Sequence, residues 1–575
     1  MVASTQLSSF DRTILPCFEP KQRDGVKNMA EIVLVQPYTG SWDEMSIRYP
    51  ESLLSVASVP VAKGYDVVIL DQRTSPNFEA ELDRAVGSET VIFGLSAITG
   101  EQVKYALRLS QLLKEKYPHI PLCWGGIHAT LVPEQTVRHP LIDYAVVGDG
   151  EYVFCELFER LRDGAPVGDL RGVVYKTDAG IASNAGELEV TERGDRGAFT
   201  FVRKNGTADI IRDMDSLPPL PYHLIDFDKY SVFHLKDGRR SATLNTSRGC
   251  PYRCKFCSDP VINEGKWRGY SSKVVLEKVR HLYEVQNVGM IYFQDDYFPG
   301  SKKRFIEILK GLGEFDGDLK WSTLGVRADT LCKLSDEEWE LLARSGCHSL
   351  EIGIETGNEK TLARINKAET IGEMREVNQK LANYDIKVKY TLIVGFPFET
   401  KEEIMDSLRF AVELETVNPN AYCLIFNFMP IIGTPFYKDA LGQGFKEPQT
   451  LEEWGHMDFD SWLRHYRSWA AKDYIDWLEA ISFVSKFHNK NVGYKFGNSA
   501  LLRFCFTLYH PIAKWRFRHN FYDYCIEVEM QRWLLATKFA LRRGYQKLQS
   551  LVTGVMTPAH RLDNPRPVSE SGPGC

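Results

Sequence analysis

The most informative segment of this 575-residue chain reads Thr246-Ser247-Arg248-Gly249-Cys250-Pro251-Tyr252-Arg253-Cys254-Lys255-Phe256-Cys257. Its cysteines follow a short apolar run that predicts a β-strand, so they fall in a loop at the carboxyl end of that strand. Three thiolates at this spacing can hold three irons of a 4Fe–4S cube. No fourth cysteine lies nearby, which leaves the fourth iron open to another ligand. We therefore predict that Cys250, Cys254 and Cys257 are cluster ligands.

A zinc site and a chance grouping of cysteines are the alternatives. Structural zinc sites take four close Cys or His ligands, whereas the nearest downstream histidine, His281, falls inside a predicted helix. The other nine of the 12 cysteines are scattered singly, mostly in apolar contexts. They are expected to be small buried side chains in a reducing compartment.

The cysteine segment follows the first of six predicted strands, which alternate with helical segments. Val275, Val279 and Leu282, for example, recur at helical spacing and share one face. Parallel strands with right-handed crossovers curl into an open barrel, so a partial (β/α)6 barrel is expected at 237–450. Its strands are predicted at 242–246, 290–294, 320–326, 349–354, 387–394 and 423–429.

Residues 29–165 show a similar alternation. Continuous apolar runs ending in Gly, Asp or Ser lie at 32–35, 67–71, 91–95, 122–126 and 144–148, with an apolar helix around 53–61. Such runs predict a doubly wound parallel sheet. Ligands of these sheets bind at the carboxyl ends of the strands. The residues that fall there are Gln36, Asp71, Ser96, Thr99, Gly125, Gly126, Gly148 and Gly150.

The expected fold class is therefore α/β, with further segments around the two sheets. Residues 1–28 are predicted to be a loose arm. Residues 166–236 are predicted to be a connector with a small β element, ending in the stiff proline-rich run at 217–221. Trp- and Tyr-rich helical patterns predict a helical C-terminal region at 451–560, and 561–575 are expected to be disordered.

Composition limits the function classes. With 43% hydrophobic residues, 25% charged residues and a net charge of −6, the chain gives no global reason to expect nucleic acid as its partner. Residues 1–21 do not resemble a secretory signal. No uninterrupted apolar run approaches the roughly 18 residues of a membrane span. A cytoplasmic location is expected.

Residues 496–550 combine many Lys and Arg residues with interleaved aromatic and aliphatic side chains. Basic helices with an apolar face bind anionic membrane surfaces or amphiphilic substrates, so peripheral contact with the inner membrane face is one expectation. The other is a helical cap that closes the mouth of the barrel and has a solvated outer face. The two expectations are compatible.

The segment 246–257 resembles the signature of the radical S-adenosylmethionine (SAM) superfamily. In that family the amino and carboxylate groups of SAM chelate the open iron. An electron from the cluster then cleaves SAM to methionine and a 5′-deoxyadenosyl radical. The resemblance spans about residues 240–440 and implies an electron donor of the flavodoxin or ferredoxin type.

Other barrel segments resemble parts of that family's SAM site. Residues 353–357 resemble the segment that contacts ribose and methionine, and residues 393–397 resemble the adenine-side strand, although Phe398 stands where glycine is common. For Asp295, Asp296 and Arg327 the alternative is a structural ion pair. The SAM-binding residues that the resemblance implies are Phe256, Asp295, Asp296, Arg327, Gly353, Glu355, Gly395 and Pro397.

The order of the parts resembles the cobalamin-dependent, or class B, radical SAM proteins. Segments 124–130 and 146–151 are similar to the cobalamin-binding domain of that family. Cobalt-ligating domains have a histidine after the first strand, but residues 36–41 contain none, so no protein histidine is expected beneath cobalt. The alternative is a relic domain that binds nothing, with His128 as a hydrogen-bonding loop residue. The cobalamin contacts implied are Ser96, Thr99, Gly125, Gly126, Gly148 and Gly150.

These resemblances imply a biosynthetic methyltransferase with three cofactors: a 4Fe–4S cluster, SAM and cobalamin. One SAM would methylate cobalamin and a second would yield the radical that prepares an unactivated carbon for methylation. The substrate would be a small molecule, a natural product or a lipid. Enzymes of the same architecture that cyclise, oxidise or couple are the second hypothesis. A cluster-bearing sensor is the third, and the SAM segments around Glu355 and Gly395 argue against it. No catalytic side chain is predicted.

Overall fold

The computed structural model describes residues 29–40, 43, 47–177, 187–193, 199–206, 208–230, 238–315, 318–457, 471–491, 500–523, 526 and 529. The predictions for the arm at 1–28, for the tail at 561–575 and for the basic residues beyond 529 lie outside this range.

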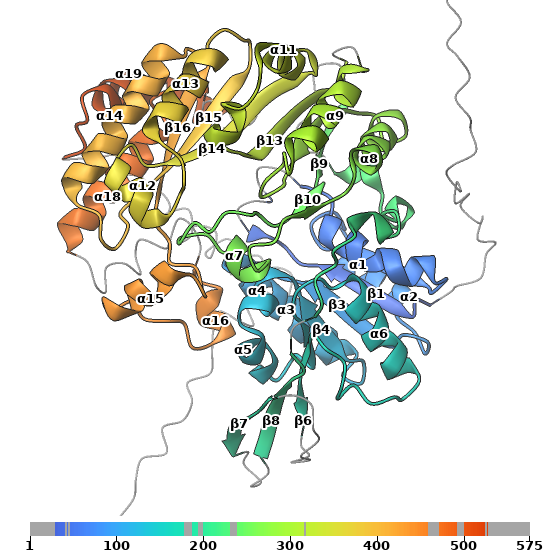
Figure 1. Ribbon diagram of the computed structural model, residues 1–575. Coiled ribbons are helices and arrows are strands. Elements are labelled where there is room, and N and C mark those ends of the chain that lie inside the picture. Colours follow the sequence, from blue (N-terminus) through green and yellow to red (C-terminus); the bar gives the residue numbers. More distant parts are fainter. Residues whose placement is uncertain are drawn as a thin grey trace, which may run out of the picture.

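The first sheet has eight strands in the order β2-β1-β3-β4-β5-β6-β8-β7. The first five strands in the chain pair in parallel, as the apolar runs predict, and every residue of β1 is buried. The small β element of the connector adds three antiparallel strands to the same sheet (Figure 1). The strands are β1 (Ile32–Gln36), β2 (Val67–Asp71), β3 (Ile92–Ser96), β4 (Leu122–Gly125), β5 (Tyr144–Val146), β6 (Val173–Thr177), β7 (Glu187–Arg193) and β8 (Phe199–Lys204). The helices are α1 (Glu51–Ala62), α2 (Phe78–Ala85), α3 (Glu101–Lys116), α4 (Gly126–Leu131), α5 (Pro133–Arg138) and α6 (Glu151–Arg162).

The second sheet has six parallel strands in the order β16-β15-β14-β13-β12-β9. Strands β9 and β16 form its two edges, so the expected open barrel is present. The strands are β9 (Arg240–Leu244), β12 (Val288–Phe293), β13 (Lys320–Val326), β14 (Cys347–Glu355), β15 (Lys387–Val394) and β16 (Ala421–Asn427). The helices are α7 (Asp259–Ile262), α8 (Ser272–Glu284), α9 (Lys302–Gly313), α10 (Ala328–Leu331), α11 (Asp336–Arg344), α12 (Glu359–Ile365), α13 (Ile371–Leu381), α14 (Lys401–Val417), α15 (Pro435–Gly442), α16 (Leu451–Trp454), α18 (Lys472–Ser485) and α19 (Ala500–Arg518).

Burial along β15 shows how this sheet is layered. Val388, Tyr390, Leu392 and Val394 are buried, whereas the residues between them are partly exposed. Successive side chains of a strand point to opposite faces, so one face of the sheet packs on helices and the other borders the barrel interior. Helices α11, α13 and α14 each begin with a capping box, in which a Ser or Thr and a Glu three residues later satisfy the first backbone amides.

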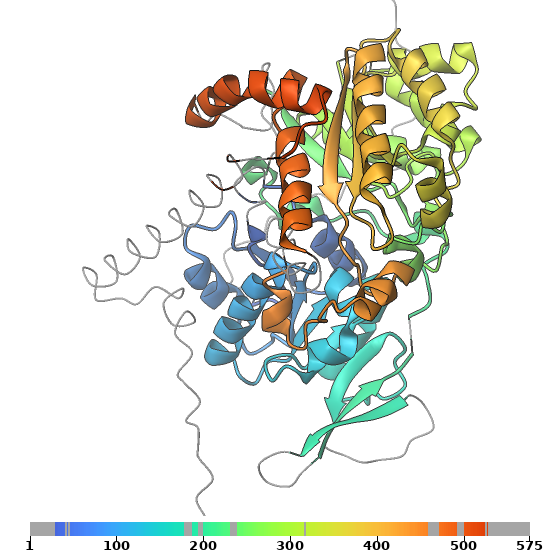
Figure 2. The ribbon, with the colours of Figure 1, turned by 90° about the vertical axis from the view of Figure 1, so that its left-hand side faces the viewer.

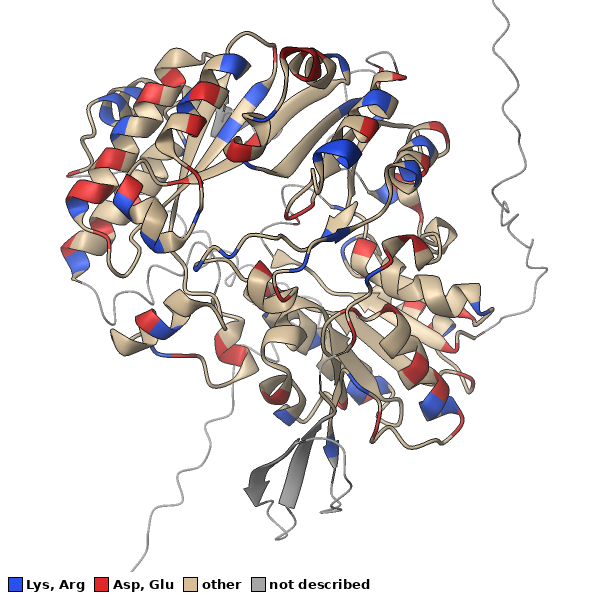
Figure 3. Ribbon diagram, in the orientation of Figure 1, with Lys and Arg blue, Asp and Glu red and all other residues tan. Residues whose placement is uncertain are grey.

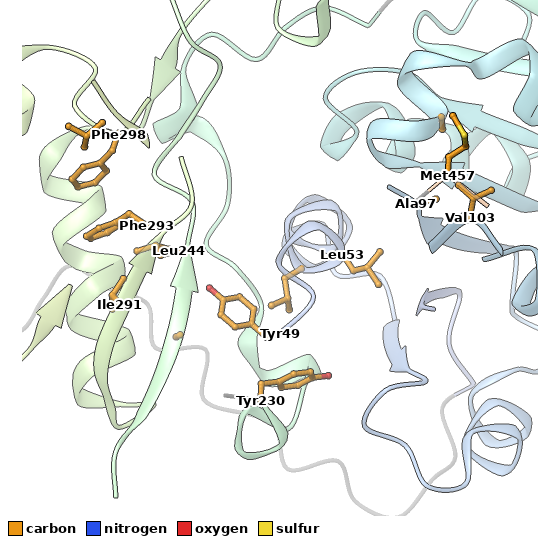
Figure 4. Packing of buried hydrophobic residues seen from close by; sticks show 14 of the residues in the cluster. Tyr49, Leu53, Ala97, Val103, Tyr230, Leu244, Ile291, Phe293, Phe298 and Met457 are labelled. Carbon is orange, nitrogen blue, oxygen red and sulfur yellow. The ribbon is translucent and has the colours of Figure 1, made fainter. Parts of the chain in front are cut away.

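A short hairpin, β10 (Ser247–Arg248) with β11 (Arg268–Gly269), brings the two sheets together, and the cysteine segment and α7 lie between them (Figure 1). Buried side chains of both sheets belong to one hydrophobic cluster, whereas Tyr422 and Leu424 of β16 form a small separate one. Figure 4 shows Tyr49 between Leu53 and Leu244, and the hydroxyl of Tyr49 donates a hydrogen bond to the carbonyl of Thr243. The two sheets are therefore packed as one body.

The chain beyond β16 contacts both sheets. Met457, just after α16, lies beside Ala97, which follows β3, and beside Val103 of α3 (Figure 4). Helix α18 lies along the β16 edge (Figure 2), where Ser485 accepts a hydrogen bond from the amide of Ile425 at 3.2 Å. Covering an edge strand in this way protects it from pairing with other chains. None of the helices in the described ranges is both long enough and apolar enough to cross a membrane.

Candidate functional site

The cysteine loop starts at a glycine that no other residue could replace without strain. Gly249 has φ +83°, and a Cβ on it would lie 2.1 Å from the carbonyl oxygen of Lys266. Asp259 then ties the two ends of the loop: its carboxylate accepts from the amide of Cys250 at 2.7 Å, and its amide donates to the Sγ of Cys257 at 3.4 Å. Sequence reasoning missed Asp259, although an acidic residue two positions after the last cysteine was a visible signal.

All three thiols are partly buried, and their electrostatics differ. Burial raises the pKa of Cys250 to about 11 and that of Cys257 to about 12. Burial also raises the pKa of Cys254, but the cations of Lys367 and Arg327 oppose that shift. Free thiols in this loop are therefore protonated at neutral pH, and a metal that binds them as thiolates must displace protons.

The donor set fits a cluster better than a single ion. Within the described ranges, no three Cys, His, Asp or Glu side chains converge on one metal-sized position. A structural zinc ion takes four close Cys or His ligands, and this loop offers three. Three soft thiolates spread around a loop suit three separate irons of a cubane. The residues present thus fit the cluster that the sequence predicts.

Glu355, at the carboxyl end of β14, has an unusual backbone. Its φ of +62° is in the left-handed region, which a residue with a side chain rarely adopts and which is often found at functional sites. Gly353 leaves room for the carboxylate, because a Cβ there would lie 2.4 Å from Oε1 of Glu355. Lys367, which is itself buried, lies 3.1 Å from that oxygen and 3.4 Å from Glu369. Lys367 therefore holds the carboxylate of Glu355 at the carboxyl end of β14 and shares its charge with Glu369.

Arg327 has protein partners on several sides. Its Nε donates to Asp329 at 2.9 Å, and one terminal nitrogen donates to the carbonyl of Lys367 at 2.8 Å. Its guanidinium carbon lies 3.5 Å from the ring centroid of Tyr252, a residue of the cysteine loop. The ion pair named as the alternative for Arg327 is therefore formed.

The two aspartates that follow β12 have different surroundings. Oδ1 of Asp295 accepts from the amide of Thr246 at 3.0 Å, from its hydroxyl at 2.8 Å and from the hydroxyl of Ser247, while Oδ2 is buried without a partner among the described residues. Burial raises the pKa of Asp295 to about 6. Asp296 is exposed, and burial together with the nearby charge of Asp296 raises the pKa of Asp259 to about 7.

The turn after β15 is held by a residue that sequence reasoning missed. Gly395 has φ +83°, and its amide and that of Phe396 donate to Oε2 of Glu399 at 2.7 and 3.3 Å. Burial raises the pKa of Glu399 to about 8. The ring of Phe256 lies 5.9 Å from that of Phe396, so the cysteine loop packs on this turn. The carbonyl of Pro397 accepts a hydrogen bond at 3.2 Å from the side-chain amide of Gln443, the residue after α15.

The glycines of the first sheet allow close backbone approaches. Gly126 has φ +87°, and a Cβ on it would lie 2.7 Å from Oγ of Ser96 and 2.9 Å from the carbonyl of Ala97. Gly148 also has a positive φ, +89°, and its amide donates to the hydroxyl of Thr130 at 3.1 Å. Gly125 ends β4 and Gly150 precedes α6. These residues and Thr99 all lie at the carboxyl ends of β3, β4 and β5.

His128 is fully buried beside this edge. Its Nδ1 lies 3.1 Å from the hydroxyl of Thr99, and its ring makes an edge contact with Trp454 at 6.0 Å between centroids. Burial lowers its pKa to about 3, so the ring is neutral. His128 makes the predicted hydrogen-bonding contact, with Thr99, but it lies in α4 rather than in a loop, and its Nε2 is buried without a partner among the described residues.

The same edge carries exposed apolar side chains that sequence reasoning did not single out. Tyr38, Ile98 and Ile127 follow β1, β3 and β4, and each is more than 40% exposed. Exposed apolar residues grouped at the ligand-binding edge of a parallel sheet indicate a ligand with an apolar face. A corrin macrocycle has such a face, so the residues present fit cobalamin.

Two family models match separate parts of the chain. The B12 binding domain matches residues 48–158, and the radical SAM superfamily matches residues 244–411. The first match runs from just before α1 into α6, and the second runs from the end of β9 into α14. Each match therefore contains one of the two candidate sites.

Individual relatives match over most of the chain. An uncharacterized methyltransferase of Pyrococcus horikoshii is 27% identical over 443 residues, which are 76% of this chain and 89% of that protein. The anaerobic magnesium-protoporphyrin IX monomethyl ester cyclase of Rubrivivax gelatinosus is 27% identical over 383 residues, 65% of this chain and 62% of that protein. The solved structure of the cobalamin-dependent S-adenosylmethionine radical enzyme OxsB with aqua-cobalamin matches with a TM-score of 0.59 and 18% identity over 93% of this chain and 83% of that chain.

Proposed function

The chain belongs to the cobalamin-dependent radical SAM enzymes, and from that premise we propose that it methylates an unactivated carbon of a small-molecule or lipid-like substrate. When bound, the cluster with SAM supplies a radical that removes a substrate hydrogen, and cobalamin supplies the methyl group. One observation carries the proposal: the cysteine loop and the carboxyl edge of the first sheet meet, since Arg248 pairs with Asp149 at 2.9 Å. A substrate held between them would reach both cofactors.

We assign the barrel residues to roles that their contacts support. Cys250, Cys254 and Cys257 hold the cluster, and Phe256 packs beside them. Glu355 accepts a hydrogen bond from SAM in the space that Gly353 leaves. Gly395 and Pro397 border the adenine, on a turn that Glu399 fixes. The exposed Asp296 faces the amino group of SAM, and Oδ2 of Asp295, which has no partner in the described part of the chain, is offered to the same group. Arg327 is a positioning residue, because Asp329 and the carbonyl of Lys367 already accept hydrogen bonds from it.

We assign cobalamin to the carboxyl edge of the first sheet. The exposed Tyr38, Ile98 and Ile127 support this assignment, because they offer apolar contact to the macrocycle. Residues 36–40 contain no histidine, and His128 is fully buried with its Nδ1 beside the hydroxyl of Thr99. The residues proposed to contact the cofactor are Ser96, Thr99, Gly125, Gly126, Gly148 and Gly150.

The test uses SAM labelled in its methyl group. The holoenzyme, a reductant and a cell extract of metabolites should give a product with the labelled methyl mass. S-adenosylhomocysteine and 5′-deoxyadenosine should appear in about equal amounts, since methyl donation and radical formation each consume one SAM. An unlabelled product formed with 5′-deoxyadenosine alone would contradict methyl transfer.

A second candidate function is cyclisation, oxidation or coupling without methyl transfer. The similarity to the magnesium-protoporphyrin IX monomethyl ester cyclase of Rubrivivax gelatinosus, at the same 27% identity as the methyltransferase relative, favours it. The two functions differ in one measurable product, because only methyl transfer releases S-adenosylhomocysteine.

We propose that the electron donor is an acidic redox protein of the flavodoxin or ferredoxin type that docks on the cysteine loop. Arg253 and Lys255 stand between the cysteines and are exposed, and Figure 3 shows basic residues along this loop. Opposite charges steer such encounters and raise association rates. Arg253→Glu with Lys255→Glu should slow 5′-deoxyadenosine formation driven by flavodoxin, but not formation driven by dithionite.

We also propose that α19 contacts an anionic membrane surface. The helix contains no acidic residue, and Phe504, Leu508, Ile512 and Trp515 are each at least half exposed along it. An apolar stripe on a basic helix is the pattern of an interfacial helix. The protein should sediment with phosphatidylglycerol vesicles more than with phosphatidylcholine vesicles, and Leu508→Glu should abolish the difference.

A further inference from the structure

Two arginines stand side by side on the hairpin that begins the cysteine loop. Arg248 of β10 is the register partner of Arg268 of β11. Like charges directly opposite each other on two strands destabilise the pairing. The hairpin therefore depends on an anion that both arginines share.

Asp149 of the first sheet's edge is that anion. Arg248 donates to its Oδ1 at 2.9 Å, and Arg268 donates to Oδ1 and to Oδ2, each at 2.8 Å. The side chains of Arg268 and Asp149 are 6% and 9% exposed, so water screens this contact little. Both bonds come from Nη2 of Arg268, while its Nη1 donates to Asn263 at 2.9 Å, so the planar guanidinium is fixed on two sides.

Glu151 and Ser55 complete this group of charged and polar side chains on the side of the first sheet. Glu151 is almost fully buried and pairs with the second terminal nitrogen of Arg248, while Ser55 donates to its Oε1 at 2.6 Å. Burial alone would raise the pKa of Glu151, but Arg248 holds it below its ordinary value, so the carboxylate is charged. Buried ion pairs of this kind contribute little net stability and are better explained by the geometry that they impose.

These charged side chains join the two candidate cofactor sites, because Asp149 and Arg248 each lie next to one of the sites in the sequence. Asp149 lies between Gly148 and Gly150, which we assign to cobalamin, and only Gly249 separates Arg248 from the first cysteine of the loop. We propose that Asp149, with Arg248 and Arg268, is a positioning residue for methyl transfer. It fixes the carboxyl edge of the first sheet, where we place cobalamin, relative to the cysteine loop, where we place the iron–sulfur cluster. The proposal rests on the proposed function, because it concerns how the same two sites are aligned.

The test compares Asp149→Asn with the wild-type holoenzyme. Asparagine keeps the size of the side chain but removes the charge that the two arginines share. A displacement of about 1 Å between reacting groups lowers rates by about 100-fold. The variant should retain iron, corrinoid and 5′-deoxyadenosine formation, but its ratio of labelled product to 5′-deoxyadenosine should fall by about tenfold or more.

A control and a graded variant separate this role from general destabilisation. Lys63 and Glu159 form an ion pair at 2.8 Å within the first domain, away from the hairpin. Glu159→Gln should leave the product ratio unchanged. Arg268→Lys keeps the charge but loses the planar guanidinium, which donates to Asp149 through Nη2 and to Asn263 through Nη1, so its ratio should lie between those of the wild type and Asp149→Asn.

A spectroscopic measurement decides the proposal even if no methyl group is transferred. In the wild type, the paramagnetic reduced cluster should broaden the signal of cob(II)alamin, and Asp149→Asn should reduce this broadening while both signals persist. An unlabelled wild-type product with reduced broadening in the variant would overturn methyl transfer but support the positioning role. Unchanged broadening and an unchanged product ratio would overturn the positioning role.

Discussion

Replacing Glu355 by Gln tests the proposed SAM contact. The carboxylate of Glu355 lies 3.1 Å from Lys367, which also lies 3.4 Å from Glu369. Lys367 therefore keeps one anion in Glu355→Gln, and the loss of folding stability should be smaller than the roughly 3–5 kcal/mol of an unpaired buried charge. The loss of a charge-assisted hydrogen bond to SAM should weaken binding by about 1–3 kcal/mol. This corresponds to a dissociation constant about 5- to 150-fold higher.

The assay is equilibrium binding of SAM to the reconstituted protein, with the absorption spectrum of the cluster as a check on loading. Glu351→Gln is the matched control, because Glu351 lies on the same face of β14, two residues before Gly353, and pairs with Lys389 at 2.5 Å. The control should bind SAM as the wild type does. Unchanged affinity in Glu355→Gln would refute the contact, and equal losses in both variants would assign the effect to the general charge of the barrel.

Two further predictions concern the first sheet and its contact with the barrel. Gly126→Ala should lose bound corrinoid, because its Cβ would lie 2.7 Å from Oγ of Ser96. Gly64→Ala is the control, since Gly64 has a similar φ of +90° and open space around it. It should lose only the roughly 1–2 kcal/mol of stability that the backbone conformation costs, and should retain corrinoid. Equal corrinoid content in the two variants would contradict the close-approach argument. Burial raises the pKa of Glu51 from 4.5 to about 7. Between these two pH values the folded chain keeps a proton on Glu51 that the unfolded chain has released. The contribution of Glu51 to the free energy of unfolding should therefore fall as the pH rises from 4.5 to 7. Urea unfolding at several pH values should show a flatter dependence for Glu51→Gln, and an identical dependence would refute this assignment.

Patterns local in sequence predicted most of the fold. Strands β13 and β15 begin and end where the apolar runs do, because each run is bounded by polar or turn residues. The antiparallel extension β6–β8 was expected only as a small element of the connector. Its place in the first sheet depends on pairing with β5, which no local pattern encodes.

The candidate site was predictable where chemistry and spacing coincide, as in the three cysteines. Residues that act through distant partners were not predictable. Asp149 meets Arg268, which lies 119 positions later in the chain, and Lys367 reaches Glu355 across the turn after α12. For Arg327 the sequence left two roles open, and only the positions of Asp329 and Tyr252 favour the ion pair.

Metal and corrinoid analysis of a single purified chain tests the central claim most directly, namely that two separate cofactor sites lie on one chain. Wild-type protein, reconstituted without oxygen and supplied with cobalamin, should contain about four irons and one corrinoid per chain. Replacing Cys250, Cys254 and Cys257 by Ala should remove the iron and SAM cleavage but leave the corrinoid. A wild-type chain with iron and no corrinoid, or a triple variant that still forms 5′-deoxyadenosine, would contradict the account.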